Sequence, residues 1–161
     1  GLGYIGLPTA AIIARSGCQV IGVDTSESVV ETINRGDIHI EEVDLDGLVQ
    51  AVVARGTLRA SNEMPEADVY VIAVPTPFVK ESGHEPDTGY VMSAVDAIAP
   101  VLRAGALVIC ESTCPVGTTN AIRDRPSLLR ALIHGNASNW VGSNALGSSP
   151  IETHSGAGIE A

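Results

Sequence analysis

The chain opens on a glycine-rich turn that leads directly into a helical pattern. Gly1, Gly3 and Gly6 have the G-x-G-x-x-G spacing, and the strand pattern that follows ends in Asp24, eighteen residues after Gly6. The order of turn, helix, strand and acidic residue is typical of a dinucleotide site at a helix N-terminus. An ordinary helix start with a solvated aspartate is the alternative. Because all four positions occur in order, the sequence favours the dinucleotide site.

Each residue of this motif would have its own task in such a site. Gly1 would allow the tight turn, Gly3 would let the backbone approach the phosphates, and Gly6 would let the helix pack close to the sheet. The helix N-terminus offers N–H groups and a positive dipole end to the phosphates. Asp24 would accept hydrogen bonds from ribose hydroxyls and repel a 2′-phosphate, which favours NAD over NADP. The motif alone leaves open another adenosine cofactor, such as a methyl donor.

Short Val- and Ile-rich runs alternate with amphipathic stretches over the first 119 residues. This alternation predicts an α/β fold, a Rossmann-type doubly wound parallel sheet. In that fold a strand precedes the glycine turn, so we expect a truncated sheet whose first strand is missing before residue 1. The expected strands are 19–23, 57–60, 69–74 and 106–111, and the expected helices are 8–16, 26–35, 46–55 and 90–102.

Composition limits the partners of the chain. The formal net charge is −10, which argues against a nucleic-acid or anionic membrane partner. No apolar run approaches the roughly 18 residues of a membrane span. The three cysteines contain no C-x-x-C pair and fit a reducing compartment, with Cys18 and Cys110 as small core residues and Cys114 in a loop. We expect a cytoplasmic protein with a small-molecule partner, no nucleic acid and no membrane.

Two later loops carry hydroxyl groups at the ends of predicted strands. Pro75-Thr76-Pro77 follows one strand, and a loop from Ser112 to Thr119 follows the next. Ligands bind at the carboxyl ends of strands in open α/β sheets, so Thr76 and Thr119 could contact ribose or phosphate oxygens. A turn role for Thr76 and a helix N-cap role for Thr118 or Thr119 are left open.

Two further regions predict no site. His84, Glu85 and Asp87 share one loop without a second ligand set, so we expect a turn and no metal. From about residue 120 the alternation fades and Gly, Ser and Asn become frequent, which predicts a divergent, poorly ordered tail over 120–161 with at most a short helix at 127–133. The dinucleotide-binding domain is therefore expected over residues 1–119, with the substrate domain absent.

Several segments carry a family resemblance. GLGYIGLPTAA, VIGVD, INRGDIHIEEVDL, AVPTPF, HEPDTGYV and ESTCPVGTT resemble, in this order, the N-terminal NAD-binding domain of the UDP-glucose/GDP-mannose dehydrogenase family. INRGDIHI and HEPDTGYV are most similar to the branch that acts on UDP-N-acetyl-D-mannosamine, while UDP-N-acetylglucosamine enzymes share the EPD loop. The resemblance implies NAD contacts from Tyr4, Ile5, Asp24, Thr76 and Thr119. It also implies that Thr113 helps position water, an auxiliary catalytic role.

The resemblance further implies a reaction. Members of the family oxidise C6 of a nucleotide sugar from alcohol to carboxylate with two NAD, and a cysteine thiolate captures the intermediate aldehyde. In the family that cysteine lies beyond the N-terminal domain. We therefore expect an NAD-binding fragment, inactive alone, of a homo-oligomeric enzyme that converts UDP-N-acetyl-D-mannosamine to UDP-N-acetyl-D-mannosaminuronate for polysaccharide synthesis. The alternatives are a UDP-N-acetylglucosamine or UDP-glucose dehydrogenase fragment and a non-catalytic dinucleotide-binding module.

Overall fold

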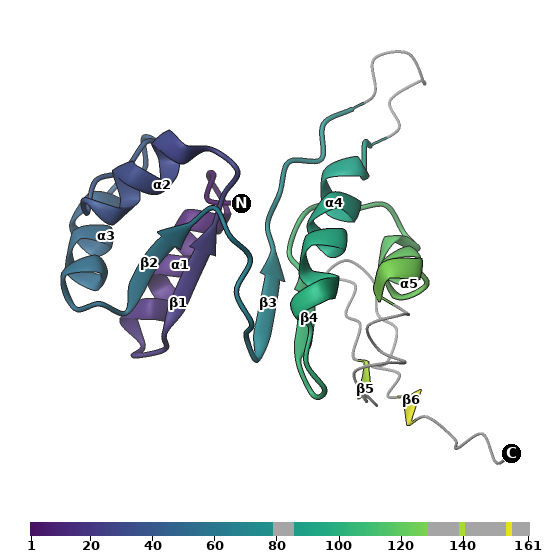
Figure 1. The fold of residues 1–161 in the computed structure, drawn as a ribbon. Helices are drawn as coiled ribbons and strands as arrows, with labels where there is room; N and C mark the ends of the chain where they lie inside the picture. Colours follow the sequence, from purple (N-terminus) through teal and green to yellow (C-terminus); the bar gives the residue numbers. More distant parts are fainter. Residues whose placement is uncertain (79–85, 129–138, 141–153, 156–161) are drawn as a thin grey trace, which may run out of the picture. The chain divides into compact units, whose positions relative to one another are not determined.

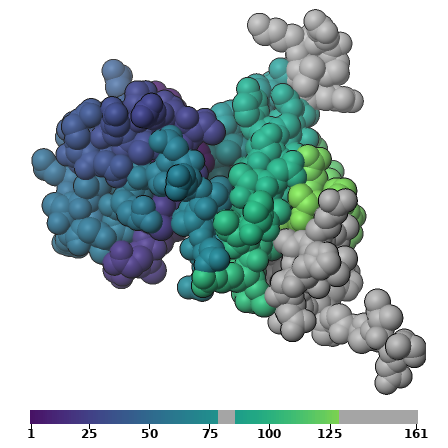
Figure 2. Space-filling model, in the orientation of Figure 1, coloured from purple at the N-terminus to yellow at the C-terminus, as the bar shows by residue number. Residues whose placement is uncertain are grey.

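The computed structural model describes residues 1–78, 86–128, 139–140 and 154–155. The chain divides into two compact units, Gly1–Pro65 (unit 1) and Glu66–Ala161 (unit 2), and each is described by itself. Figure 1 labels their helices and strands, and Figure 2 shows unit 1, from purple to blue, as a closely packed body.

Unit 1 is a parallel pair of strands with three helices packed around it (Figure 1). β1 (Val20–Val23) pairs with β2 (Leu58–Ser61), from Val20 opposite Leu58 to Val23 opposite Ser61. α1 (Gly6–Arg15) packs on β1 and on α3 (Leu45–Ala54), and α2 (Glu27–Asn34) packs on β2. The sequence prediction for these five elements is confirmed to within two residues at each end.

The apolar core of unit 1 lies between its helices and its strands. Three alanines of α1 belong to this core, and their small side chains let the helix approach its neighbours closely. The buried side chains of the cluster are Leu2, Leu7, Ala10, Ala11, Ala14, Val30, Ile33, Ile40, Leu45, Val49, Val52, Leu58 and Ala60. Unit 1 therefore has a core of its own, drawn from residues between Leu2 and Ala60.

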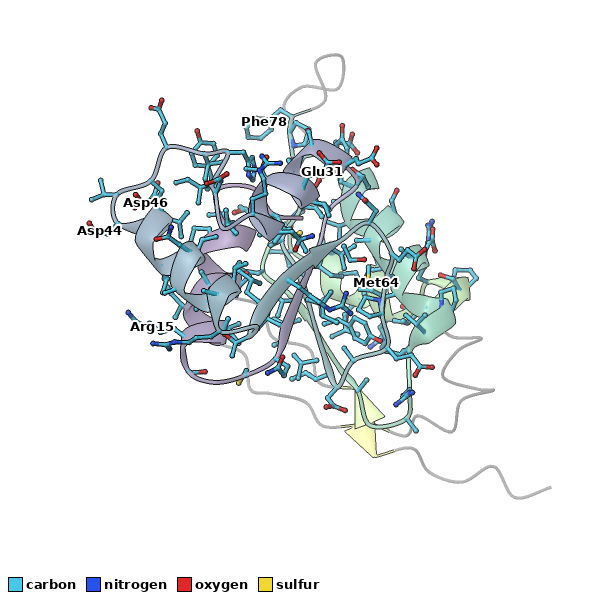
Figure 3. The ribbon with its side chains drawn as sticks, turned by 60° about the vertical axis from the view of Figure 1, so that its left-hand side comes forward. Arg15, Glu31, Asp44, Asp46, Met64 and Phe78 are labelled. Carbon is cyan, nitrogen blue, oxygen red and sulfur yellow. The ribbon has the colours of Figure 1, made fainter. Side chains whose placement is uncertain are left out.

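Turn residues with positive φ set where the helices of unit 1 begin and end. Gly17 (φ 99°) and Gly56 (φ 71°) follow α1 and α3 and precede β1 and β2. This left-handed conformation favours glycine, and a glycine at either position suits the end of a helix. Asp44 (φ 63°) is the residue before α3, and Asp46 lies in the first turn of that helix, where a negative charge suits the helix dipole (Figure 3).

A side chain closes the outer edge of β2. Asn34, the last residue of α2, donates from Nδ2 to the carbonyl oxygen of Ala60 (3.0 Å), and its Oδ1 accepts the N–H of Ala60 (2.8 Å). The side-chain amide therefore makes the two hydrogen bonds that a neighbouring strand would make at this residue. The same pair of bonds anchors the end of α2 on the sheet.

Unit 2 contains a second parallel pair. β3 (Val69–Ile72) pairs with β4 (Leu107–Cys110), from Val69 opposite Leu107 to Ile72 opposite Cys110. Helix α4 (Gly89–Ile98) packs on β3 and continues as the 3-10 helix η1 (Ala99–Val101). Helix α5 (Thr118–Arg123) follows β4, and β5 (Asn139–Trp140) pairs antiparallel with β6 (His154–Ser155). The tail expected over 120–161 lies for the most part outside the described residues.

The amphipathic pattern of α4 is confirmed. Val91, Val95 and Ile98 form its buried face, with at most 3% of each side chain exposed. The predicted helix over 90–102 is too long, because Pro100 lacks an N–H donor and the chain changes to a 3-10 turn there. The buried Tyr70 on β3 packs at the same end, and its hydroxyl donates to the carbonyl of Val101 (3.1 Å).

Helix α5 begins where the N-cap alternative for Thr118 or Thr119 left a helix open, although no bounds were predicted for it. A charge cluster holds the segment after it. Arg125 donates from Nε and Nη2 to the carboxylate of Asp96 on α4 (3.1 and 2.6 Å), and the Ser127 hydroxyl donates to the same carboxylate (2.6 Å). These hydrogen bonds lower the pKa of Asp96 from 3.8 to about 2. Because the folded pKa is the lower one, this stabilisation is present above pH 3.8 and is lost as the pH falls towards 2.

Cys18 does not lie in the core. The thiol was expected to be buried, but Cys18 is exposed, and the hydroxyl of Ser16 donates to its sulfur (3.6 Å). The prediction is wrong because the chain turns at Gly17 and leaves the residue between α1 and β1 at the surface. Cys110, which was also expected in the core, is only half-buried at the end of β4, and Cys114 in the loop is half-buried as well.

The contribution of the two Asn34–Ala60 hydrogen bonds to stability can be measured by unfolding. Asn34→Ala removes both hydrogen bonds to Ala60, each worth about 0.5–1.5 kcal/mol, so we expect the free energy of unfolding to fall by about 1–3 kcal/mol. Urea titration followed by circular dichroism measures this change. Asn120→Ala, at an exposed position of α5, is the control and should change stability by less than about 0.5 kcal/mol. If both substitutions changed the free energy of unfolding by the same small amount, the stabilising role of the Asn34–Ala60 hydrogen bonds would be contradicted.

Candidate cofactor site

The glycine turn presents an open surface at the start of α1. Tyr4 and Ile5 expose 64% and 58% of their side chains, whereas Leu2 between the first two glycines is buried. The hydrogen bonding of α1 begins with the N–H of Leu7, which donates to the carbonyl oxygen of Gly3 (3.1 Å). No acidic residue lies in the first turn of α1, so the positive end of the helix dipole is not neutralised there. The turn therefore suits an anionic ligand.

Gly3 is not required by the packing of the protein. A Cβ placed on Gly3 meets no atom within 4 Å, and its φ is not in the left-handed region. The space in front of Gly3 is where a phosphate would approach the N–H groups that begin a helix. Gly6, in contrast, is buried as the first residue of α1. A glycine at position 3 is therefore explained by a ligand better than by the fold.

Asp24 joins the turn to the end of β1. Its Oδ2 accepts the backbone N–H of Leu2 (2.8 Å), and its Oδ1 accepts the backbone N–H of Ser26 (2.9 Å). Each carboxylate oxygen can accept a further hydrogen bond. The carboxylate is thus fixed in direction and keeps acceptor capacity, and the predicted contact with ribose hydroxyls stays a prediction.

Gly22 lets Leu2 lie directly on β1. A Cβ on Gly22 would stand 2.4 Å from Cδ2 and 2.9 Å from Cδ1 of Leu2, which is 2% exposed. Such distances leave no room for a side chain, so the close approach depends on this glycine. The sequence analysis gave Gly22 no role, although a glycine inside a strand pattern is a signal for close backbone approach.

A second missed residue supports the same strand end. The side-chain amide of Asn62 donates to the carbonyl oxygen of Asp24 (2.9 Å), and the N–H of Asp24 donates to the carbonyl of Ser61 (3.1 Å). Asp24 is therefore held at its backbone as well as at its carboxylate. No sequence pattern marked Asn62, because an exposed Asn after a strand is common in turns.

The residues present fit a dinucleotide. Unit 1 has open space at Gly3, a helix N-terminus without acidic residues and an oriented Asp24 carboxylate, which are the features that a dinucleotide would need for its phosphates and a ribose. Phosphates would be held by the turn and the start of α1, and a ribose by Asp24. Hydride acceptance is the chemistry that NAD would supply when bound.

In unit 2, Ser112 joins the loops that follow β3 and β4. Its hydroxyl accepts the N–H of Val74 (2.8 Å) and donates to the carbonyl of the same residue (2.9 Å). The N–H of Ser112 also donates to the carbonyl of Ile72 (3.1 Å). The pairing of the two strands is thus extended to the segments that carry Thr76 and Thr113. Ser112 belongs to the ESTCPVGTT segment, but no sequence pattern indicates that its hydroxyl joins the two loops.

The threonines of unit 2 have different surroundings. Thr76 is half-buried and Thr113 is exposed in their loops. Thr118 is buried and donates to the carbonyl of Pro115 (2.8 Å), and Thr119 lies in the first turn of α5. Gly117 occupies the N-cap position of α5, so neither Thr118 nor Thr119 has the N-cap role.

The structure places the predicted residues in two groups. Unit 1 carries Gly1, Gly3, Tyr4, Ile5, Gly6 and Asp24, and unit 2 carries Thr76, Thr113 and Thr119. A hollow of about 560 Å³ in unit 1 contains none of these residues. It is lined by Thr32, Arg35, Gly36, Asp37, Ile38, Asp46, Gly47 and Gln50.

No metal site is found in the part of the chain that the structure describes, where no three His, Cys, Asp or Glu side chains come together. His84 and Glu85 of the predicted turn lie outside that part. Within the same described residues, none of the helices combines the length and the hydropathy that crossing a bilayer requires.

Comparison with known proteins identifies the family. The model of the NAD-binding domain of the UDP-glucose/GDP-mannose dehydrogenase family matches residues 1–132. The chain belongs to this family. The match runs beyond Thr119, where we expected the resemblance to end, and it assigns NAD as the cofactor of the matched domain.

Curated relatives are similar over most of the chain. The UDP-N-acetyl-D-mannosamine dehydrogenase of Escherichia coli strain K12 is 58% identical over 124 residues, which are 77% of this chain and 29% of the relative. The NDP-N-acetyl-D-galactosaminuronic acid dehydrogenase of Ralstonia nicotianae is 54% identical with the same coverage. The chain thus spans less than a third of these dehydrogenases.

Solved structures confirm the α/β Rossmann-type fold. The UDP-N-acetyl-mannosamine dehydrogenase of S. aureus superposes with a TM-score of 0.77 at 33% identity, over 88% of this chain and 34% of that chain. A ternary complex of GDP-mannose dehydrogenase from Pseudomonas aeruginosa gives a TM-score of 0.74 at 26% identity, over 89% and 35% of the two chains. The chain corresponds to about the first third of such enzymes.

Two glycine substitutions separate ligand binding from folding. Gly3→Ala meets open space in the protein, so we expect little change in the free energy of unfolding but about tenfold or greater weakening of NADH binding, which is ~1.4 kcal/mol or more. Fluorescence titration with NADH measures the affinity. Gly47→Ala on α3 is the matched control, since a Cβ there also meets nothing within 4 Å.

The control should bind NADH as the parent chain does, and it should be more stable by about 0.5–1 kcal/mol because alanine favours a helix. Unchanged NADH affinity in Gly3→Ala would contradict a phosphate site at the turn.

Proposed function

We propose that the protein to which this chain belongs is an NAD-dependent dehydrogenase that oxidises C6 of UDP-N-acetyl-D-mannosamine to the carboxylate with two NAD. The observation that carries the choice of sugar is the 58% identity over 124 residues to the E. coli enzyme of that name. In this proposal the chain supplies the domain that holds NAD, and the remaining residues of the enzyme supply the sugar site and the nucleophilic cysteine.

Unit 1 binds and selects the cofactor in this proposal. Gly3 leaves room for the phosphates against the start of α1, where N–H groups and the helix dipole stabilise their charge. Asp24 accepts hydrogen bonds from the adenosine ribose, and its negative charge excludes a 2′-phosphate. The hydrogen bonds from Leu2 and Ser26 hold that carboxylate in place before the cofactor arrives.

Unit 2 contributes hydroxyl groups near the reacting end of the cofactor. Thr76 and Thr119 contact cofactor oxygens, and Thr113 positions a water molecule for the hydrolytic step. Ser112 fixes the two loops that carry Thr76 and Thr113, since its hydroxyl bonds both backbone groups of Val74. Preorganised positions of this kind matter because a displacement of ~1 Å can cost about 100-fold in rate.

The complete enzyme is proposed to be cytoplasmic and homo-oligomeric. A second substrate class is favoured by one observation, the 54% identity to the NDP-N-acetyl-D-galactosaminuronic acid dehydrogenase over the same length. The two candidates share the cofactor site and differ only in the nucleotide sugar, so they are separated by substrate assays and not by NAD binding.

The assay uses the full-length protein. NADH formation is measured with UDP-N-acetyl-D-mannosamine, UDP-N-acetylglucosamine, UDP-N-acetylgalactosamine and UDP-glucose. We expect the highest kcat/KM with the mannosamine sugar and two NADH per sugar oxidised. Activity on UDP-glucose alone would refute the proposed substrate. Gly3→Ala in the same protein should raise the KM for NAD, and Gly47→Ala should leave it unchanged.

A further inference from the structure

Two cysteines of unit 2 lie side by side in a position that no other function explains. The sulfur atoms of Cys110 and Cys114 are 3.6 Å apart. Cys110 is the last residue of β4, and Cys114 lies four residues further in the loop that also carries Thr113. We propose that this pair is an oxidation site, at which a hydroperoxide converts the two thiols to an intramolecular disulfide.

The geometry allows this bond with a small movement. A disulfide has an S–S distance of about 2.05 Å, so the two sulfur atoms must approach by about 1.5 Å. Cys110 is fixed in the ladder of β3 and β4, where it stands opposite Ile72. Cys114 belongs to a loop, so the loop is the part that moves. Cys18, the third thiol, belongs to unit 1 and is not part of this pair.

The environment of the pair sets the order of the chemistry. Burial, together with the hydrogen bond to Cys114, raises the pKa of Cys110 to about 12, so Cys110 remains a thiol at neutral pH. Cys110 is also held in the ladder of β4, whereas Cys114 lies in the loop, so we assign Cys114 as the residue that attacks. Its thiolate takes the terminal oxygen of the hydroperoxide and becomes a sulfenic acid, and the peroxide leaves as an alcohol or as water.

The second step closes the disulfide. The sulfur of Cys110 attacks the sulfur of the Cys114 sulfenic acid, the S–S bond forms and the S–O bond breaks. The proton of the Cys110 thiol leaves with the hydroxide as water. In total two thiols lose two electrons and two protons, and one peroxide is reduced. A dithiol reductant reverses the change.

Oxidation would change the position of the loop after β4, which carries Thr113. Ser112 is bonded to Val74 and Ile72 and cannot follow the loop, whereas Cys114 must move towards β4. Thr113 lies between the fixed residue and the moving one, so its position changes. The moving loop also leads to Thr119 in the first turn of α5. This part of the inference rests on the proposed function, in which Thr119 contacts the cofactor. The oxidised chain should then bind NADH about tenfold or more weakly, because a contact with the cofactor is displaced.

The first experiment follows the thiols and is independent of the proposed function. The folded chain carrying Cys18→Ser is treated with hydrogen peroxide, blocked with N-ethylmaleimide and digested with trypsin. Residues 104–123 form one tryptic peptide that contains both cysteines. We expect this peptide to lose two hydrogen atoms and to recover them with dithiothreitol. Two maleimide adducts on this peptide after peroxide treatment would overturn the proposal.

Single variants test the order of the two steps. In Cys110→Ser the sulfenic acid on Cys114 has no partner, so dimedone should label Cys114. In Cys114→Ser the remaining thiol should react with peroxide at least about tenfold more slowly, because it stays protonated. Equal reaction rates of the two variants would contradict the assignment of Cys114 as the attacking residue. Cys110→Ala replaces Cys110→Ser if the serine variant does not fold.

A second readout separates the two parts of the inference. NADH affinity is measured on the reduced and the oxidised chain and again after reduction. Weaker binding that reduction restores, and that is absent in Cys110→Ser, supports the coupling to the cofactor site. Disulfide formation with unchanged NADH affinity would overturn that coupling. A reduced chain that does not bind NADH, while the disulfide still forms, would instead refute the proposed function.

Discussion

The carboxylate of Asp24 is the constraint on which the cofactor site of unit 1 depends. It accepts the N–H of Leu2 on one oxygen and the N–H of Ser26 on the other, and so it ties the glycine turn to the end of β1. Leu2 can pack directly on β1 only because Gly22 has no side chain where the Leu2 side chain lies. The same carboxylate is the group that we propose to accept hydroxyl groups of a ribose, so in this proposal one residue serves both the fold and the ligand.

Ser112 has a comparable role in unit 2. Its hydroxyl bonds both backbone groups of Val74 and continues the pairing of β3 and β4 beyond the strands. The loops with Thr76 and Thr113 begin at this fixed point, so their hydroxyl groups are positioned by the sheet. The thiol of Cys110 contacts the same serine, since its sulfur lies 4.0 Å from the carbonyl oxygen of Ser112 and 3.6 Å from the sulfur of Cys114. A change at the thiols is for this reason expected to be felt at Thr113 and not at Thr76.

The amino-acid sequence was sufficient for features that depend on local pattern. Alternating apolar runs located β1 and β2. The glycine turn and Asp24 were recognised by their spacing. The family resemblance, and with it the cofactor, was confirmed by comparison. These features are set within a few residues of chain, where propensity and periodicity carry the information.

Features that depend on distant residues could not be predicted. The bonds from Asn34 to Ala60 and from Asn62 to Asp24 join segments far apart in sequence, and no local pattern announces them. The bounds of helix α5 were not predicted, because the segment after it is anchored by a contact with Asp96 on α4. Cys18 was wrongly placed in the core because composition suggests that free cysteines are buried, whereas the turn at Gly17 decides its exposure.

The central claim is that Asp24 both orders the glycine turn and selects NAD, and the dissociation constants of NADH and NADPH for the chain and for Asp24→Asn test it most directly. The parent chain should bind NADH more tightly than NADPH. The variant should lose at least about tenfold in NADH affinity, which is ~1.4 kcal/mol, and should bind the two cofactors with more nearly equal strength. A variant that binds NADH as the parent does, with the same preference over NADPH, would contradict the account.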